Sequence, residues 1–182
     1  MRYGPVFIKD KFGRDVELRN AEVSDSAEMI KYLKTICGET PYVIRDPDEI
    51  NLTLEQEQKI LQNKIDSEDE LLLVALVEGK HVGNCSLMSF GDLRRYRHRC
   101  SVAIALYQEY CGLGIGRQMM DTVLRAAKDL GYEQAELEVN SSNANAIALY
   151  ESMGFVKYGT YPDSDKFADG TYGDSYWMMK KL

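Results

Sequence analysis

The sequence predicts a mixed α/β fold in which helices are interleaved with the strands of one sheet. Short apolar runs of strand length alternate with segments of helical periodicity along the chain. A glycine-rich loop joins one buried strand to an amphipathic helix. The chain has 182 residues, of which 45% are hydrophobic and 28% charged. This is enough for a sizeable core, and we expect one domain over residues 1–182.

The first third of the chain predicts a strand, a helix and a loop. Residues 16–19 alternate apolar and polar side chains, as a half-exposed strand does. Ser24 can cap a helix that runs to about Cys37. Residues 38–52 contain a glycine and two prolines, which indicate a loop. We expect the inward face of the helix to contain Ala27, Ile30 and Leu33.

A second helix and a hairpin follow the loop. Thr53 and Gln56 have the spacing of a capping box, which predicts that a helix starts there. Residues 71–77 and 82–88 are apolar segments of strand length. Glu78-Gly79-Lys80 is a turn between them, so the two strands form a hairpin.

The central segment of the chain has the arrangement of a phosphate-binding site. Residues 102–106 form an uncharged apolar run that predicts a buried strand. Gly112, Gly114 and Gly116 follow, and apolar residues at helical spacing begin directly after them. Glycines let the backbone approach an anion, and a helix N-terminus offers unpaired N–H groups and a positive dipole end. Arg117 adds a full positive charge.

Two common phosphate-binding motifs do not fit this loop. The dinucleotide fingerprint requires a third glycine where Met119 stands. The P-loop requires Lys and Ser or Thr after its last glycine, and here Arg117 and Gln118 follow Gly116. A nicotinamide-dependent oxidoreductase is therefore a distant alternative.

The last third of the chain predicts two strands around a helix, and then a final strand. Residues 135–139 form a strand, and residues 143–152 a helix with Gly154 in the C-cap region. We expect residues 155–158 and 175–180 to be the last two strands, joined by a long loop.

Two segments, Cys111–Gly116 and residues 137–155, together resemble the Gcn5-related N-acetyltransferase (GNAT) superfamily. In that family a Gln/Arg-x-x-Gly-x-Gly/Ala segment holds the pyrophosphate of acetyl-coenzyme A (acetyl-CoA). Here the segment reads CGLGIG, and Cys111 departs from the expected Gln or Arg. That departure removes one side chain but leaves the backbone amides.

The resemblance implies a mostly antiparallel sheet that is splayed at the cofactor site, with about four flanking helices. It also implies acetyl-CoA as co-substrate and no metal. The implied cofactor-binding residues are Ile104, Ala105, Leu106, Gly112, Leu113, Gly114, Ile115, Gly116, Arg117 and Asn143. Within the family, the C-terminal motif is most similar to the bacterial ribosomal-protein alanine acetyltransferases.

Tyr150 is the candidate general acid. Asn143, Ile147 and Tyr150 share one face of the predicted helix. A phenol there can protonate a leaving thiolate, and Asn143 can bind the cofactor arm. A buried core tyrosine is the alternative from periodicity alone, but the motif match favours the catalytic role.

Glu138 is the main candidate for the general base. Many relatives carry a glutamate on the central strand, but residues 101–105 contain none. Glu138 lies where the alanine acetyltransferases place their base, and an ordinary solvent-facing glutamate is an equal alternative. His98 is a weaker choice, and water is a third.

Other polar and aromatic groups have ordinary explanations. The basic run Arg94–Arg99 is a solvated loop, or it binds an acidic substrate or partner. Cys111 has no paired histidine, which argues against a nucleophile. Near the C-terminus, four aromatic residues can line an amine pocket or pack in a hairpin: Tyr161, Tyr172, Tyr176 and Trp177.

Composition limits the class of protein further. The net charge of −7 argues against general nucleic-acid binding, and no apolar run approaches the ~20 residues of a membrane span. The first fifteen residues contain no signal-peptide core, and the four cysteines show no metal spacing. We therefore expect a cytoplasmic protein with reduced thiols, and a homodimer is possible.

The predicted function is transfer of an acetyl group from acetyl-CoA to a primary amine by direct attack. The loops that would select the acceptor, residues 38–52, 89–99 and 159–174, carry no recognisable motif. A small-molecule acceptor is slightly favoured over a protein N-terminus or lysine. A non-catalytic acyl-CoA binding module is the alternative from another class. The missing strand glutamate favours this module, and Asn143 and Tyr150 oppose it.

Overall fold

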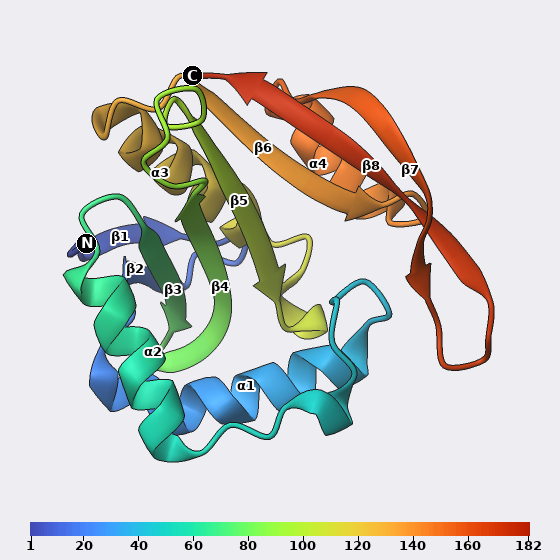
Figure 1. Cartoon of the computed structure of the whole chain (residues 1–182). Helices are drawn as coiled ribbons and strands as arrows, with labels where there is room; N and C mark the ends of the chain where they lie inside the picture. The colour runs from blue at the N-terminus through green and yellow to red at the C-terminus, as the bar shows by residue number, and fades with distance from the viewer.

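The computed structural model describes residues 1–182 and contains one eight-stranded sheet (Figure 1). The sheet order is β1-β2-β3-β4-β5-β6-β8-β7, and every neighbouring pair is antiparallel except β5 and β6. The strands are β1 (Val6–Lys9), β2 (Asp15–Asn20), β3 (Leu71–Val77), β4 (Lys80–Ser89), β5 (Arg99–Leu106), β6 (Gln134–Asn140), β7 (Val156–Lys166) and β8 (Tyr172–Lys181). The predicted mixed, mostly antiparallel sheet is confirmed.

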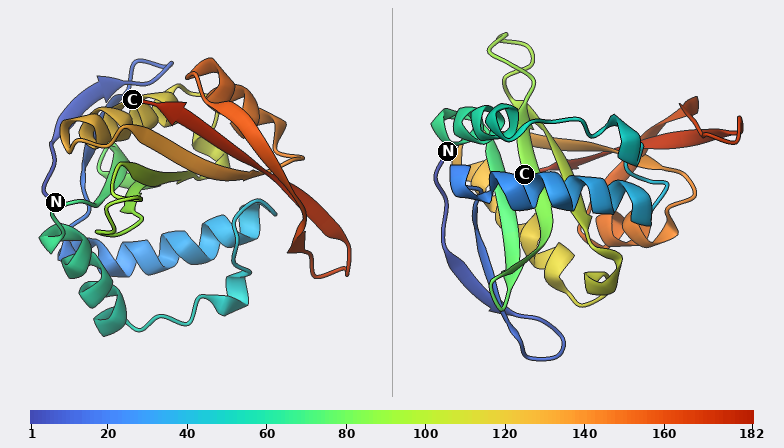
Figure 2. Two further views of the ribbon diagram at one scale, coloured as in Figure 1. Left: turned by 45° about the horizontal axis from the view of Figure 1, so that its top comes forward. Right: turned by 90° about the horizontal axis from the view of Figure 1, so that it is seen from below.

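Four α-helices cover the two faces of this sheet, as predicted (Figure 2). One face carries α1 (Ser26–Glu39) and α2 (Leu54–Asp66), and the other carries α3 (Ile115–Asp129) and α4 (Ala144–Ser152). Short 3₁₀ turns cover residues 23–25, 47–49 and 108–110. None of the helices combines the length and the apolar character needed to cross a membrane.

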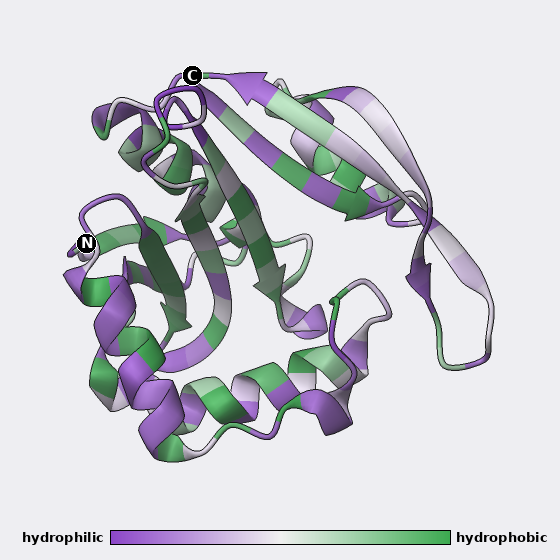
Figure 3. Ribbon diagram, viewed as in Figure 1, coloured by the Kyte–Doolittle hydropathy of each residue, from purple (hydrophilic) through white to green (hydrophobic).

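The core lies between the sheet and the helices on each face. Strand β3 is almost entirely apolar and has five of its seven residues buried. The buried face of α3 includes Ile115, Met119, Val123 and Ala127, which recur every fourth residue. Figure 3 shows the apolar central strands between helices whose outer turns are hydrophilic.

Strands β5 and β6 diverge after a short paired segment, and this divergence creates the site. Their parallel register covers Arg99↔Gln134 to Ser101↔Glu136 and then ends. On its other side, β5 stays paired with β4 as far as Leu106. The last residues of β5, 102–106, therefore have no β6 partner, and the expected splay of the sheet is confirmed (Figure 1).

The start of α1 differs from the expectation. Ser24 lies in a 3₁₀ turn and does not cap the helix, which begins at Ser26. Asp25 ties this turn down instead, because its carboxylate accepts from the Glu22 N–H and from the Arg19 guanidinium. The buried face is also rotated from the predicted one, since Ala27 is exposed and Ile30 and Leu33 are half-buried. Its buried residues include Met29, Tyr32, Ile36 and Cys37.

The two ends of the sheet also differ from the sequence analysis. A strand that was not predicted, β1, pairs with β2 at one edge. At the other edge, β7 and β8 extend through most of the segment that was expected to be a long loop. Pro162 lies in β7, an edge strand where a missing N–H is tolerated, and the register is irregular on both sides of it.

Candidate active site

The loop before α3 presents a row of unpaired backbone donors. The N–H groups of residues 112–117 donate no hydrogen bond within the protein. Gly112 and Gly114 have φ values of 73° and 88°, which favour glycine, and a Cβ at either would meet no protein atom within 4 Å. Gly114 is the N-cap of α3, so the positive end of the helix dipole faces the same space. This arrangement suits an anion such as a pyrophosphate.

Gly116 brings the loop against the free end of β5 and against α4. A Cβ at Gly116 would lie 3.3 Å from Leu106 Cδ1, 3.6 Å from Ile104 Cδ1 and 3.9 Å from Leu149 Cδ2. The predicted phosphate loop and the predicted arm-binding strand are therefore neighbours. One backbone group there is already occupied, because the Ala105 carbonyl oxygen accepts a 2.7 Å hydrogen bond from the Tyr32 hydroxyl.

Arg117 supplies a positive charge that no carboxylate neutralises. Its Nη2 donates to the Ser152 hydroxyl at 2.7 Å, and no acidic side chain lies within ion-pair distance. The guanidinium is exposed at the first turn of α3. Its charge adds to the anion-binding character of the loop.

Asn143 and Tyr150 both belong to α4, but they differ in what they contact. Asn143 is the N-cap, and its Oδ1 accepts from the Ala146 N–H at 3.2 Å. Its Nδ2 has no partner within the protein and can donate to a ligand. The predicted helix from residue 143 thus begins at Ala144, with Asn143 fixing its start.

Tyr150 is 94% buried, yet its hydroxyl makes no hydrogen bond within the protein. Buried tyrosine hydroxyls usually find a partner. No side-chain oxygen that is sealed from solvent lacks a partner in this structure, so the Tyr150 oxygen retains some exposure to solvent. Burial raises the pKa of Tyr150 well above its usual value, so the phenol keeps its proton at neutral pH.

Glu138 lies on the opposite face of the sheet from the buried Leu137 and Val139. Its carboxylate is exposed and accepts a 3.2 Å hydrogen bond from the Trp177 indole. Trp177 lies directly opposite it in the β6–β8 register. The pairing of β5 with β6 ends two residues before Glu138, at Ser101↔Glu136.

His98 does not share this position. It precedes Arg99, which pairs with Gln134 at the start of β6. Glu138 lies four residues farther along, about 13 Å at ~3.3 Å per residue. Arg94, Arg95 and Arg97 in the same loop are exposed and make no ion pair. The basic loop is therefore at the paired end of β5, away from the splayed end.

A charged cluster that sequence reasoning missed holds the paired end together. Arg99 donates to both carboxylate oxygens of the buried Glu136, with an Nη2···Oε2 distance of 2.7 Å. This ion pair lowers the pKa of Glu136. The guanidinium carbon also lies 5.0 Å from the Phe90 ring centre and 5.3 Å from that of Tyr96. No local motif reveals this pair, because it depends on the parallel register of β5 and β6.

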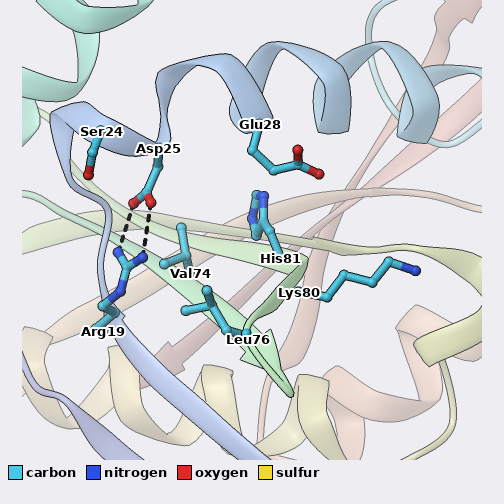
Figure 4. A pocket seen from close by; sticks show the side chains of 9 residues that line it. Arg19, Ser24, Asp25, Glu28, Val74, Leu76, Lys80 and His81 are labelled. Atoms are coloured by element: carbon cyan, nitrogen blue, oxygen red, sulfur yellow. Dashed lines mark hydrogen bonds and ion pairs between the residues drawn. The ribbon is translucent and has the colours of Figure 1, made fainter.

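A cavity of about 350 Å³ opens elsewhere, beside the start of α1 (Figure 4). Its charged groups already have partners within the protein. Arg19 makes a two-pronged ion pair with Asp25, and His81 bonds the Asn84 side chain at 2.6 Å. None of the predicted site residues lines this cavity.

Comparison with known proteins identifies the family. The sequence profile of the acetyltransferase (GNAT) family matches residues 37–155. The chain belongs to this family. It is therefore an acetyl-CoA-dependent N-acetyltransferase.

Individual GNAT relatives cover nearly the whole chain. An N-alpha-acetyltransferase from Saccharolobus solfataricus is 31% identical over 96% of this chain and 97% of its own length. One from Sulfurisphaera tokodaii is 28% identical over 97% and 99%. The crystal structure of a GNAT-family acetyltransferase from Streptococcus pneumoniae superposes with a TM-score of 0.87. That protein is 27% identical, and the match covers 92% of this chain and 99% of the other.

Proposed function

We propose that this GNAT enzyme acetylates the α-amine at the N-terminus of a protein or peptide. The observation that carries the proposal is the end-to-end similarity to two enzymes named N-alpha-acetyltransferase. The matched regions cover nearly the whole chain, and so they also span the loops that would select the acceptor. From the sequence alone we slightly favoured a small-molecule acceptor, and these relatives move the proposal to a peptide N-terminus.

The loop and the free end of β5 hold the co-substrate in this proposal. Backbone N–H groups of residues 112–117 bind the pyrophosphate, and Arg117 adds charge. Unpaired backbone groups at residues 104–106 bind the extended arm as an added strand would. Acetyl-CoA supplies a thioester, whose carbonyl carbon is open to attack by a neutral amine.

Tyr150 and Glu138 divide the proton transfers. The acceptor nitrogen forms a C–N bond to the acyl carbon as the C–S bond breaks. Tyr150, which is protonated at neutral pH, gives its proton to the leaving sulfur. Glu138, directly or through water, takes the proton from the attacking amine, and Trp177 orients its carboxylate.

A binding module without catalysis explains these groups less well. In such a module nothing requires a tyrosine whose ring is buried while its hydroxyl has no partner within the protein. In an enzyme the same hydroxyl is kept free for a proton transfer. The Tyr150 hydroxyl therefore favours the catalytic proposal.

A peptide assay tests the acceptor. The purified chain is incubated with acetyl-CoA and, separately, with three kinds of acceptor. These are a peptide that has a free N-terminus and an internal lysine, the same peptide with its N-terminus blocked, and a panel of small amines. Thiol release gives rates, and mass spectrometry locates the acetyl group. We expect transfer to the free α-amine and none to the blocked peptide. Transfer to small amines alone, or to the lysine side chain, would contradict the proposal.

A further inference from the structure

Three aromatic side chains, Tyr158, Trp177 and Tyr161, form a continuous exposed row. The Trp177 ring centre lies 6.2 Å from that of Tyr158, with an interplanar angle of 29°, and 5.6 Å from that of Tyr161. Their exposed fractions are 38% for Trp177, 51% for Tyr158 and 50% for Tyr161. We call these three residues the aromatic row.

The aromatic row lies beside the candidate base. Trp177 and Glu138 are register partners on one face of the sheet, and the indole N–H donates to the Glu138 carboxylate. On the other side Trp177 faces Gly159 of β7, where a Cβ would lie 3.3 Å from Trp177 Cε3. Glycine at 159 therefore lets the indole lie flat over β7. Trp177, at the centre of the row, is therefore positioned by contacts with both neighbouring strands.

One acidic segment belongs to the same hairpin as the row, and a second approaches the β6–α4 connection. Residues 39–49, after α1, contain four acids and one base, and residues 159–174, in the β7–β8 hairpin, also contain four acids and one base. Each has a net charge of −3, so together they account for −6 of the chain's −7. The Tyr42 hydroxyl donates to the Ser142 carbonyl at 3.3 Å, which places the first segment beside the β6–α4 connection (Figure 1).

We propose that the aromatic row binds a cationic side chain of the acceptor, within an acidic rim made by these two segments. The preferred acceptor is then a peptide N-terminus with lysine or arginine among the residues that directly follow it. Aromatic faces attract Lys and Arg cations, and the rim is complementary in charge. This inference rests on the proposed function, because it assigns the acceptor of the same site.

Two substitutions in the acidic rim and one in the aromatic row separate the contribution of the rim's charge from that of the aromatic side chains. Asp48 and Asp163 have no side-chain hydrogen bond or ion pair that holds the fold, so Asp48→Asn with Asp163→Asn removes charge alone. Tyr161→Leu removes one member of the row, whose hydroxyl has no protein partner. Phe12→Leu, at a side chain 74% exposed in the β1–β2 turn, is the control.

The test compares kcat/KM for two peptides that differ only at the second residue, Ala-Lys and Ala-Gln, with spermidine as a third acceptor. We expect a preference of about tenfold for the lysine peptide, and a smaller preference at high salt. The Asp48→Asn/Asp163→Asn variant and Tyr161→Leu should each reduce the preference at least about threefold. Phe12→Leu should leave it unchanged.

The possible failures are distinct. Equal rates on the two peptides in the parent enzyme would overturn the inference and leave the proposed function intact. A preference that survives both sets of substitutions would show that the cation binds elsewhere. If kcat/KM for spermidine were well above that for either peptide, the acceptor would be a polyamine and not a peptide. No transfer to any peptide would remove the proposed function, and the inference with it.

Discussion

At the scale of single residues, the Tyr150 hydroxyl is distinguished by what it lacks. It is buried, its pKa is raised and it has no hydrogen-bond partner. Tyr150→Phe keeps the ring and its contact with Phe155. We expect kcat to fall by roughly 10²–10⁴ with acetyl-CoA affinity and stability little changed. Stopped-flow thiol release and calorimetric titration would measure the two effects.

Tyr132 provides a matched control for this variant. It is buried to a similar degree, but its hydroxyl donates to the Asp69 carbonyl at 3.0 Å, away from the site. Tyr132→Phe should cost about 1 kcal/mol of stability and leave kcat unaltered. If Tyr150→Phe behaved in the same way, its hydroxyl would be a structural group only.

A second prediction at this scale concerns Glu57 and the stability of the folded protein. Glu57 is 3% exposed on α2, its carboxyl group has no hydrogen bond or ion pair, and burial raises its pKa. A carboxyl whose pKa is higher in the folded state destabilises the fold once it ionises. That cost is absent below its ordinary pKa of about 4.3 and grows as the pH rises through this value.

Glu57→Gln should therefore stabilise the protein at pH 7, by an amount of order 1 kcal/mol, and by less at pH 4. Urea unfolding at both pH values measures the difference. A pH-independent effect of Glu57→Gln would mean that Glu57 ionises freely in the folded state.

At the scale of elements, the two ends of α3 carry glycines in the same backbone conformation but with different surroundings. Gly114 precedes the helix and Gly131 follows it, each with a φ of 88° and no atom within 4 Å of a built Cβ. Valine at either position is strained by a comparable amount, about 1–2 kcal/mol. Only Gly114 borders the row of unpaired donors.

Gly114→Val should weaken acetyl-CoA binding about tenfold or more, because its side chain fills the space that the phosphates need. Gly131→Val should lower stability similarly and leave affinity unchanged. Equilibrium binding of acetyl-CoA to both variants decides between the two outcomes. Equal affinity in both would place the phosphates somewhere other than residues 112–117.

At the scale of the whole molecule, the splayed sheet couples co-substrate binding to stability. The free end of β5, the start of α3 and α4 meet at Gly116, so a ligand there stabilises contacts between several elements. Acetyl-CoA at a hundred times its Kd should add about 2.7 kcal/mol, or about 5–10 °C in Tm. NAD should give no shift. A scanning calorimeter would detect either result, and an equal shift with NAD would argue against a selective acetyl-CoA site.

The sequence by itself was sufficient for features that depend on local chemistry. The hairpin of β3 and β4 follows from two apolar runs around Glu78-Gly79, and the capping box at Thr53 and Gln56 forms as predicted. The loop before α3 can be predicted from the sequence because Gly112 and Gly114 have positive φ values, which favour glycine. These features involve neighbours in the chain, so their residue pattern is enough to predict them.

The tertiary structure alone decided features that depend on residues far apart in the chain. The sequence pointed to Tyr161 and Trp177 but not to Tyr158, because Tyr158 and Trp177 meet only through the β7–β8 register, and irregularities in that register cannot be inferred from composition. The Arg99–Glu136 pair likewise requires β5 and β6 to be parallel neighbours. Sequence periodicity specifies which face a side chain occupies, whereas register and strand order specify what it meets across the sheet.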